Sequence, residues 1–258
     1  MSELFDVSGK TALVTGGSRG IGQMIAHGLV RAGARVIVSS RKSEDVQAAA
    51  KELADIGECH AIVGDVSTPE GVAVISRAVR ERFDMLDILV NNAGTTWGAP
   101  LEEFPQSGWE KVLHTNVQSI FHLTVAMLAD LRAAARVNPP ARIVNIGSID
   151  GLRTPSFENY SYSASKAAVH MLTRHLAKRL AADAITVNAI APGPFESKMT
   201  AFMLDDADDR EAVAKAVPLG RIGEPEDVAG LTLLLCSRAG SYLTGTVIPL
   251  DGGITGCN

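Results

Sequence analysis

The 258-residue sequence has few cysteines, few aromatic residues and no excess of positive charge. Its three cysteines, Cys59, Cys236 and Cys257, form no C-x-x-C pair, so neither a disulfide framework nor a cysteine metal site is predicted. The net charge of −5 argues against binding to nucleic acid or to an anionic membrane surface. No apolar run approaches the roughly 20 residues that a membrane-spanning helix needs.

Other signals are missing as well. Residues 1–6 have neither a basic region nor an apolar core, so no signal peptide is evident. The six histidines show no ligand spacing, and no metal is predicted. With 46% hydrophobic and 21% charged residues, the composition is that of an ordinary globular protein that can bury a core. These features together predict a soluble protein of the reducing cytoplasm.

What the sequence does contain is an alternation of short apolar runs with longer helical stretches. The apolar runs are nearly continuous, which is typical of parallel strands covered on both faces. The alternation predicts an α/β fold, a single domain over residues 1–258 with a doubly wound sheet. The predicted strands are Thr11–Thr15, Arg35–Ser39, Ala61–Gly64, Ile88–Val90, Arg142–Ile146, Thr186–Ile190 and Thr246–Pro249. The predicted helices are Ile21–Ala32, Ser43–Ile56, Pro69–Arg82, Trp109–Arg136, Tyr160–Leu180 and Pro225–Cys236.

Residues 195–218 interrupt this alternation with a helical but weakly apolar pattern. Long insertions in compact α/β domains often cover active sites, so the segment is predicted to be a substrate lid. A solvated acidic helix on the surface is the alternative, and it suits the aspartates at the centre of the segment. These are Asp205, Asp206, Asp208 and Asp209.

A glycine-rich turn follows the first predicted strand and leads directly into a helix. Gly16 permits a tight turn, Gly20 allows close approach to a pyrophosphate, and Gly22 lets helix and strand pack closely. The helix N-terminus then offers unpaired N–H groups to the phosphates. In this context the spacing predicts a dinucleotide site rather than a simple turn. Its residues are Gly16, Ser18, Arg19, Gly20, Ile21 and Gly22.

The end of the second predicted strand carries no acidic residue where NAD sites usually place one. A carboxylate there would repel a 2′-phosphate, whereas Arg41 and Arg19 can form charge-assisted hydrogen bonds with one. The sequence therefore favours NADP(H) over NAD(H), unless Arg41 merely faces water. Further cofactor contacts are predicted where the third and fourth strands end, at Asp65, Val66, Asn92, Ala93 and Gly94.

A tyrosine and a lysine, Tyr162 and Lys166, lie four residues apart on one predicted helix and so share a face. A nearby ammonium favours the phenolate, so Lys166 is expected to lower the pKa of Tyr162 and fit it for proton transfer. Tyr160 stands six residues before the lysine and is expected to point elsewhere. Taken alone, such a pair can equally be an ordinary half-exposed helix pair.

Several motifs, in their order along the chain, resemble those of the short-chain dehydrogenase/reductase family. They are the glycine turn, Asp65, residues 91–94, Asn116, Ser148, Tyr162 with Lys166, and Pro192-Gly193. The resemblance covers essentially the whole chain and implies a single-domain extended Rossmann fold with a seven-stranded parallel sheet. Within the family the chain is most similar to 3-oxoacyl reductases, on residues 95–99 and 107–112.

The resemblance also implies roles for single residues. Tyr162 would protonate the developing alkoxide, and Ser148 would hydrogen-bond the substrate oxygen. Lys166 would hold the nicotinamide ribose, and Asn116 would help to hold a water that links Lys166 to solvent. The nicotinamide would be flanked by Pro192, Gly193, Phe195 and Ser197, and the candidate walls of an apolar substrate site are Trp97, Phe157, Phe195 and Met199.

The activity implied is NADPH-dependent reduction of a 3-oxoacyl thioester or similar apolar ketone, within fatty acid metabolism, by a homotetramer. The alternatives are a dehydrogenase of a sugar acid, polyol or cyclic ketone and, in another class, a non-catalytic NADP-binding sensor. Carrier-dependent reductases tend to have basic residues where this chain has Pro139-Pro140 and Asp183. An acyl carrier protein would therefore find less attraction here, although Arg136, Arg142 and Arg179 are close in sequence.

Overall fold

A computed structural model describes residues 3–198, 200–201 and 207–257. The predicted α/β fold is confirmed, because seven strands form one sheet in the order β3-β2-β1-β4-β5-β6-β7. Every neighbouring pair runs parallel. The strands are β1 (Thr11–Thr15), β2 (Arg35–Ser40), β3 (Cys59–Val63), β4 (Ile88–Asn91), β5 (Ala141–Ile146), β6 (Ile185–Pro192) and β7 (Val247–Leu250).

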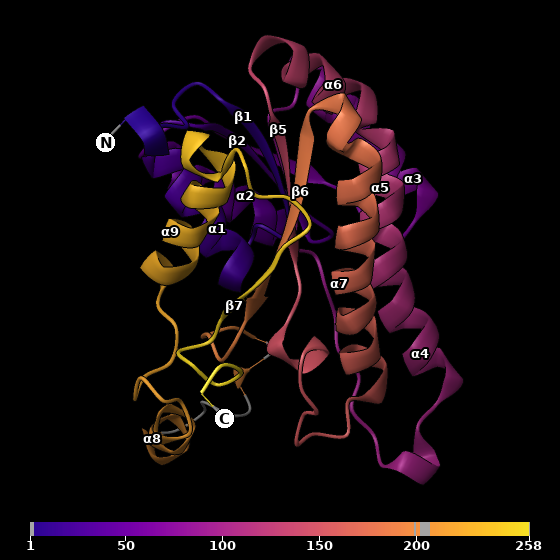
Figure 1. Cartoon of the computed structure of the whole chain (residues 1–258). Helices are drawn as coiled ribbons and strands as arrows, with labels where there is room; N and C mark the ends of the chain where they lie inside the picture. The colour runs from indigo at the N-terminus through magenta and orange to yellow at the C-terminus, as the bar shows by residue number, and fades with distance from the viewer. Residues whose placement is uncertain (1–2, 199, 202–206, 258) are drawn as a thin grey trace.

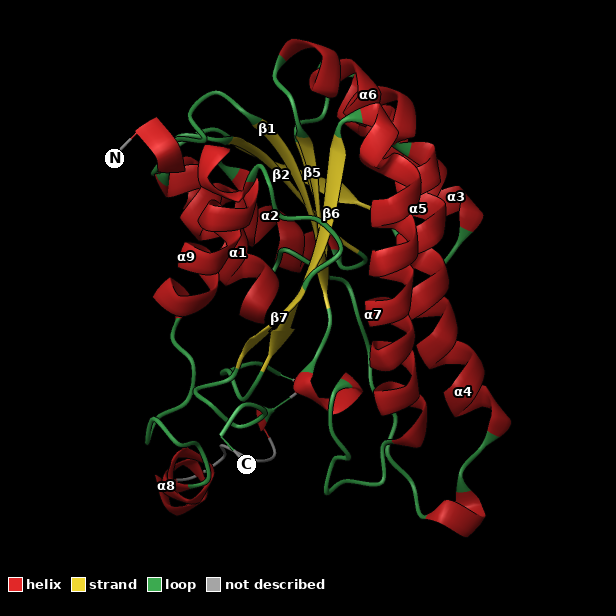
Figure 2. Cartoon of the chain, in the orientation of Figure 1, coloured by secondary structure: helices red, strands yellow, loops and turns green. Residues whose placement is uncertain are grey.

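Helices cover both faces of this sheet (Figures 1 and 2). Because alternate residues of a strand point to opposite faces, Val14 packs in the apolar cluster under one layer and Leu13 in the cluster under the other. Both faces are therefore apolar, as the continuous hydrophobic runs predicted. One layer holds α1 (Gly20–Arg31), α2 (Ser43–Ala54) and α9 (Pro225–Cys236). The other holds α3 (Pro69–Arg80), α5 (Ser119–Ala126), α6 (Leu128–Val137) and α7 (Tyr160–Leu180).

Most predicted boundaries hold to within two residues, and α7 and α9 begin and end as predicted. The third strand begins at Cys59 rather than at Ala61, because Cys59 already pairs with Val36 of β2. The second and third helices each end two residues earlier than predicted, at Ala54 and Arg80.

The single long helix predicted over Trp109–Arg136 is wrong. The chain instead forms α4 (Gln106–Leu113), a π-helical turn (His114–Gln118), α5 and, after a break at Met127, α6. At this break Arg80 donates to the Ala126 carbonyl at 2.5 Å and pairs with Asp130 at 2.9 Å. Asn116 lies in the π turn and hydrogen-bonds with Thr95 and Ser165, which are distant in the sequence, so hydrophobic periodicity alone could not indicate this local geometry.

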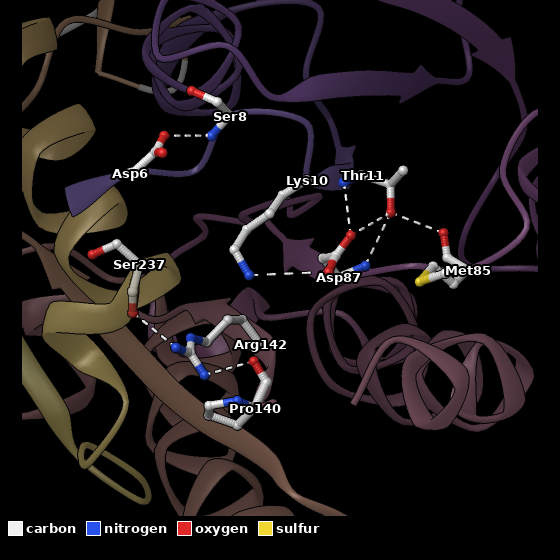
Figure 3. Close-up of polar contacts among 9 residues, drawn as sticks. All are labelled: Asp6, Ser8, Lys10, Thr11, Met85, Asp87, Pro140, Arg142 and Ser237. Carbon is white, nitrogen blue, oxygen red and sulfur yellow. Dashed lines mark hydrogen bonds and ion pairs between the residues drawn. The ribbon is translucent and has the colours of Figure 1, made fainter. Parts of the chain in front are cut away.

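The amino ends of the strands are tied together by buried charged groups (Figure 3). The Asp87 carboxylate accepts from the Thr11 main-chain N–H at 2.9 Å and its hydroxyl at 3.0 Å, and lies 4.0 Å from Lys10 Nζ. Arg142 is only 2% exposed and donates to the carbonyls of Pro140 and Ser237 at 2.7 and 2.8 Å. Since a buried guanidinium with such partners cannot reach an acyl carrier, Arg142 is removed from the candidate basic contacts.

The segment predicted as a lid, residues 195–218, contains α8 (Ala207–Lys215) among its described residues. Figure 1 places α8 beside the carboxyl end of β7. Residues 199 and 202–206, among them Asp205 and Asp206, lie outside the described part of the chain. A lid function for this segment stays a prediction. Among the described residues, no helix is long and apolar enough to span a membrane.

Candidate active site

The residues of the predicted reaction centre meet at the carboxyl edge of the sheet. Ser148 lies two residues beyond β5, and the first turn of α7 carries Tyr162. Lys166 follows one turn later on α7 and is 5% exposed. Between β5 and α7 the chain makes a short 3₁₀ turn, η4 (Ile149–Gly151), which starts with Ser148 in an extended conformation. Two neighbouring elements therefore bring the serine and the Tyr/Lys pair together.

The pKa of Tyr162 differs in direction from the sequence prediction. Burial raises it to about 12, a hydrogen bond with Ser148 lowers it, and the charge of Asp150 raises it further. The expected lowering by Lys166 is therefore wrong for this arrangement. Burial also lowers the pKa of Lys166 to about 8, since an ammonium loses hydration at this site.

Lys166 packs against the face of the tyrosine ring rather than against its hydroxyl. Its Nζ lies 5.5 Å from the ring centroid and donates to the Ile146 carbonyl at 2.8 Å. Helical spacing correctly predicted that the two side chains share a face, but it could not predict which atom the ammonium contacts. The prediction that Tyr160 points elsewhere is confirmed, because its hydroxyl donates to Glu158 at 3.0 Å.

The Asn116 side chain connects three parts of the site. Its Oδ1 accepts from the Thr95 main-chain N–H at 2.8 Å, and its Nδ2 donates to the Thr95 carbonyl and to Ser165 Oγ, each at 2.9 Å. A Cβ at Gly94 would lie 3.4 Å from Asn116 Oδ1 and 3.7 Å from Lys166 Nζ. The amide thus hydrogen-bonds with protein partners, and the water-holding role of Asn116 stays a prediction.

The glycine turn has the geometry of a phosphate cradle. Gly16 and Gly20 adopt positive φ angles of 63° and 53°, which side-chain-bearing residues rarely accept. A Cβ at Gly22 would come within 2.4 Å of the Gly16 carbonyl oxygen. Asn92 Nδ2 donates to the carbonyls of Thr15 and Gly16 at 2.9 and 3.1 Å and so fixes the turn to the end of β4.

Thr15 is a residue of this cradle that the sequence analysis missed. Its hydroxyl accepts from the main-chain N–H groups of Asn92 and Ala93 at 3.0 and 3.1 Å. A threonine at the end of a buried strand was the only available signal. Because its partners lie more than 70 residues away in the sequence, spacing alone could not assign this role.

The two arginines predicted to bind a 2′-phosphate are both exposed and only weakly paired. Arg19 precedes α1 without a side-chain cap and lies 3.4 Å from Asp45, and Arg41 lies 3.8 Å from Asp65. The side chains of Arg19 and Arg41 are 49% and 58% exposed, so both pairs are weak and can give way to a phosphate. Together with the glycine cradle, these residues fit a dinucleotide that carries a 2′-phosphate.

The residues that follow β6 lie over the glycine turn. Gly193 donates its main-chain N–H to Leu250 at 2.9 Å, directly after Pro192 ends the strand. The Cβ of Ser197 would lie 3.1 Å from a Cβ added at Gly20, so Ser197 covers the cradle. The Phe195 ring is 2% exposed and packs against Gly223. The prediction that Phe195 forms a wall of the substrate site is wrong, because its ring is buried in the core.

The remaining predicted cofactor contacts lie at the same edge of the sheet. Ile21 is partly exposed in the first turn of α1, and Ser18 is partly exposed in the glycine turn. The Asp65 carboxylate accepts from Ser67, while Val66 is 8% exposed and belongs to the core. The Val66 side chain therefore has little exposed surface with which to contact a cofactor.

The predicted substrate walls differ in their surroundings. Trp97 packs over Gly108 with the Lys111 ammonium 5.3 Å from its ring, so α4 holds it in place. Phe157 is 47% exposed in the chain between η4 and α7. Met199 lies outside the described residues. The structure therefore leaves Phe157 as the most accessible of the described aromatic candidates.

A cavity of about 780 Å³ lies between α1, α2 and the start of α9. Gly20 and Ser197 line it, but Ser148, Tyr162 and Lys166 do not. It is therefore not the place where a substrate could meet the Tyr/Lys pair.

Comparisons with known proteins agree with this geometry. A family model described as enoyl-(acyl carrier protein) reductase matches residues 16–255. The rhamnolipids biosynthesis 3-oxoacyl-[acyl-carrier-protein] reductase of Pseudomonas aeruginosa is 49% identical over 98% of this chain and 99% of its own length. The gluconate 5-dehydrogenase of Gluconobacter oxydans is 36% identical over 98% of this chain and 97% of its own length.

A solved structure is similar over the whole fold. The Pseudomonas aeruginosa RhlG/NADP active-site complex superposes with a TM-score of 0.96 at 48% identity, covering 99% of this chain and 100% of that one. The glycine cradle and the Ser/Tyr/Lys centre lie at one edge of the sheet, and the matches cover nearly the whole chain. Together these findings establish the family of the protein. The protein belongs to the short-chain dehydrogenase/reductase family.

Proposed function

We propose that this protein is an NADPH-dependent carbonyl reductase that converts a 3-oxoacyl thioester or a similar apolar ketone to the 3-hydroxy product. The proposal rests on one observation: Ser148, Tyr162 and Lys166 lie together at the carboxyl edge of the sheet, beside the glycine cradle. Oxidoreductase activity with NADP(H) agrees with the family and with the NADP complex of the similar structure. A non-catalytic sensor would have no use for all three side chains.

In the proposed reaction NADPH supplies the hydride, and the protein supplies position and a proton. Ser148 hydrogen-bonds the substrate carbonyl oxygen, and Tyr162 gives its hydroxyl proton to the same oxygen as negative charge develops there. Lys166 keeps the tyrosine ring in place and presents a cation to the nicotinamide ribose. Because Asn116 is bonded to Thr95 and Ser165, its proposed role is to hold residues 94–95 and α7 together.

Relatives favour a second substrate class. The similar gluconate 5-dehydrogenase is named for a sugar acid, and the same Ser/Tyr/Lys chemistry serves either substrate. The candidate wall residues Trp97 and Phe157 carry no charge, however, which suits an acyl chain better than a polyhydroxylated acid. We therefore place the thioester first and the sugar acid second.

An NADPH-consumption screen tests the substrate class. Acetoacetyl thioesters of coenzyme A, N-acetylcysteamine and acyl carrier protein are compared with keto-gluconates and cyclic diketones. We expect kcat/KM for the best thioester to exceed that for any keto-sugar by at least roughly tenfold. Similar values for the three thioesters would mean that the carrier is not recognised. Activity confined to keto-gluconates would contradict the acyl assignment and leave the reductase assignment standing.

The proposed assembly is a homotetramer, paired partly through α5 and α7. These helices lie on the same outer layer (Figure 2), and several of their exposed residues are apolar. Phe121 and Val125 of α5 are 45% and 53% exposed, and Met171 of α7 is 61% exposed. Ala164, Ala167 and Ala168 also lie at the surface or partly exposed on α7. Such a face is unfavourable in water and suits burial against a second copy.

We expect light scattering to give the mass of four chains at micromolar concentration. The double substitution Val125→Arg with Met171→Arg should lower that mass to that of a dimer or monomer, because two charges would be buried in each contact. Val74→Arg is a matched control, since Val74 is 46% exposed on α3, and it should leave the mass unchanged. A monomeric wild-type protein would refute the assembly.

A further inference from the structure

Asp150 is a charged residue at the reacting end of the site to which no role has yet been given. It lies on η4, two residues after Ser148, and is half-buried. Its main-chain N–H donates to Ser148 Oγ at 3.1 Å. Its Oδ2 accepts from Asn159 Nδ2 at 3.4 Å, and the Asn159 carbonyl accepts from the Tyr162 main-chain N–H at 2.8 Å. Asp150 thus sits between the serine and the start of the tyrosine helix.

The charge of Asp150 reaches the reacting atoms. Burial is the main cause that raises the pKa of Tyr162, and the Asp150 carboxylate adds to it, since a negative charge opposes formation of the phenolate. Burial also raises the pKa of Asp150, against a hydrogen bond from Asn159 and the charge of Arg153. The two groups that act on Asp150, Asn159 and Arg153, both lie in the segment between η4 and α7.

The cations nearby are already engaged. Lys166 donates to the Ile146 carbonyl, and burial lowers its pKa to about 8. Arg153 is exposed and interacts with two carboxylates, those of Asp150 and Asp251. The three charges of Asp150, Arg153 and Asp251 sum to −1. Lys166 adds one positive charge, but its Nζ lies against the Tyr162 ring and donates to the Ile146 carbonyl. A substrate carboxylate beside the reacting carbonyl would therefore be repelled by Asp150, while both of these cations are held by groups of the protein.

We propose that Asp150 is a specificity-determining residue: its carboxylate disfavours substrates with a negative charge next to the reacting carbonyl and so selects esters and thioesters over keto acids. The inference rests on the proposed carbonyl reductase function and deepens it. It separates a 3-oxoacyl thioester from the corresponding 3-keto acid by electrostatics, because the thioester is neutral at this position and the acid is not. Repulsion raises the free energy of both the complex and the transition state for an anionic substrate.

A pair of substrates that share the 3-oxo group and differ in this charge and in one ethyl group tests the proposal, and the effect of the ethyl group cancels when variant and wild type are compared. Ethyl acetoacetate is neutral, and acetoacetate is its anion-bearing counterpart with the same 3-oxo group. For the wild-type protein we expect a higher kcat/KM for the ester. Asp150→Asn keeps the size of the side chain and an oxygen that can accept from Asn159, but removes the charge. It should raise the ratio of kcat/KM for acid over ester by roughly tenfold.

Two further variants separate charge from position. Asn159→Ala removes the partner of Asp150 but keeps the carboxylate, and Asp150→Glu keeps the charge on a longer side chain. Both should retain the wild-type preference for the ester, even if overall turnover falls. An acid-to-ester ratio that is unchanged in Asp150→Asn, while the ester is still reduced, would overturn the inference and leave the proposed function intact.

A second readout does not depend on turnover. The phenol of Tyr162 can be titrated by ultraviolet absorbance, with Tyr162→Phe used to assign its contribution among the three tyrosines. Removing the Asp150 charge should shift the Tyr162 titration to lower pH, and Asn159→Ala should shift it less. If the wild type reduces neither these two substrates nor any ketone of the screen, the proposed function fails, and this titration alone decides whether the Asp150 charge acts on Tyr162. The absence of a shift would overturn the inference.

Discussion

Tyr162→Phe is expected to lower kcat for ketone reduction by roughly 10²–10⁴-fold, the usual contribution of a positioned general acid. The substitution removes one oxygen and keeps the ring against which Lys166 packs, 5.5 Å from its centroid. NADPH affinity should therefore change little. The measurement is steady-state NADPH consumption with the best substrate of the screen, together with a fluorescence titration of the cofactor. Equal turnover in wild type and variant would refute the role of Tyr162.

Tyr160→Phe provides the matched control for this experiment. It makes the same chemical change two residues away on α7, where the hydroxyl donates to Glu158 at 3.0 Å and faces away from Lys166. Turnover should stay near the wild-type value. A loss of the same size in both variants would point to a general disturbance of α7 rather than to proton transfer.

The pH dependence of the two reaction directions should differ. Since burial raises the pKa of Tyr162 to about 12, the phenol stays protonated through neutral pH, as reduction requires. Alcohol oxidation requires the phenolate, and its rate should increase as the pH rises toward that value. The raised pKa therefore keeps Tyr162 in the protonated form that reduction needs at neutral pH.

Arg41→Asp is expected to shift the NADPH-to-NADH affinity ratio by roughly a hundredfold toward NADH, because it replaces an attractive charge with a repulsive one. Arg41 is 58% exposed and lies 3.8 Å from the Asp65 carboxylate, so its side chain can turn toward a 2′-phosphate at little cost. Dissociation constants for both cofactors, measured by nicotinamide fluorescence, give the ratio directly. A wild-type protein that prefers NADH would show that the end of β2 has been misinterpreted.

Arg82→Asp is a suitable control for the cofactor experiment. It makes the same change in net charge on an exposed residue just beyond the end of α3, at the amino edge of the sheet. The NADPH-to-NADH ratio should stay as in the wild type. If both variants shift the ratio equally, the preference comes from the overall charge of the protein and not from Arg41.

The sequence determined the fold and the local geometry of the predicted site residues. Continuous apolar runs separated by helical stretches predicted the parallel sheet, since a strand covered on both faces must be apolar on both. The glycine spacing in Gly16, Gly20 and Gly22 predicted a cradle that the backbone angles and close contacts bear out. The four-residue spacing of Tyr162 and Lys166 placed them on one face of α7. All three predictions depend on local geometry, which is reflected in the spacing of residues along the chain.

Only the tertiary structure decided what surrounds each of these residues. Burial raises the pKa of Tyr162 where the neighbouring Lys166 was expected to lower it. The ring of Phe195 packs against Gly223, and the amide of Asn116 binds Thr95 and Ser165. Desolvation and partner choice are set by groups that lie many residues apart in the sequence and meet only in the folded chain. No spacing along the chain encodes them, which is why Asp150 became visible beside Tyr162 only in the structure.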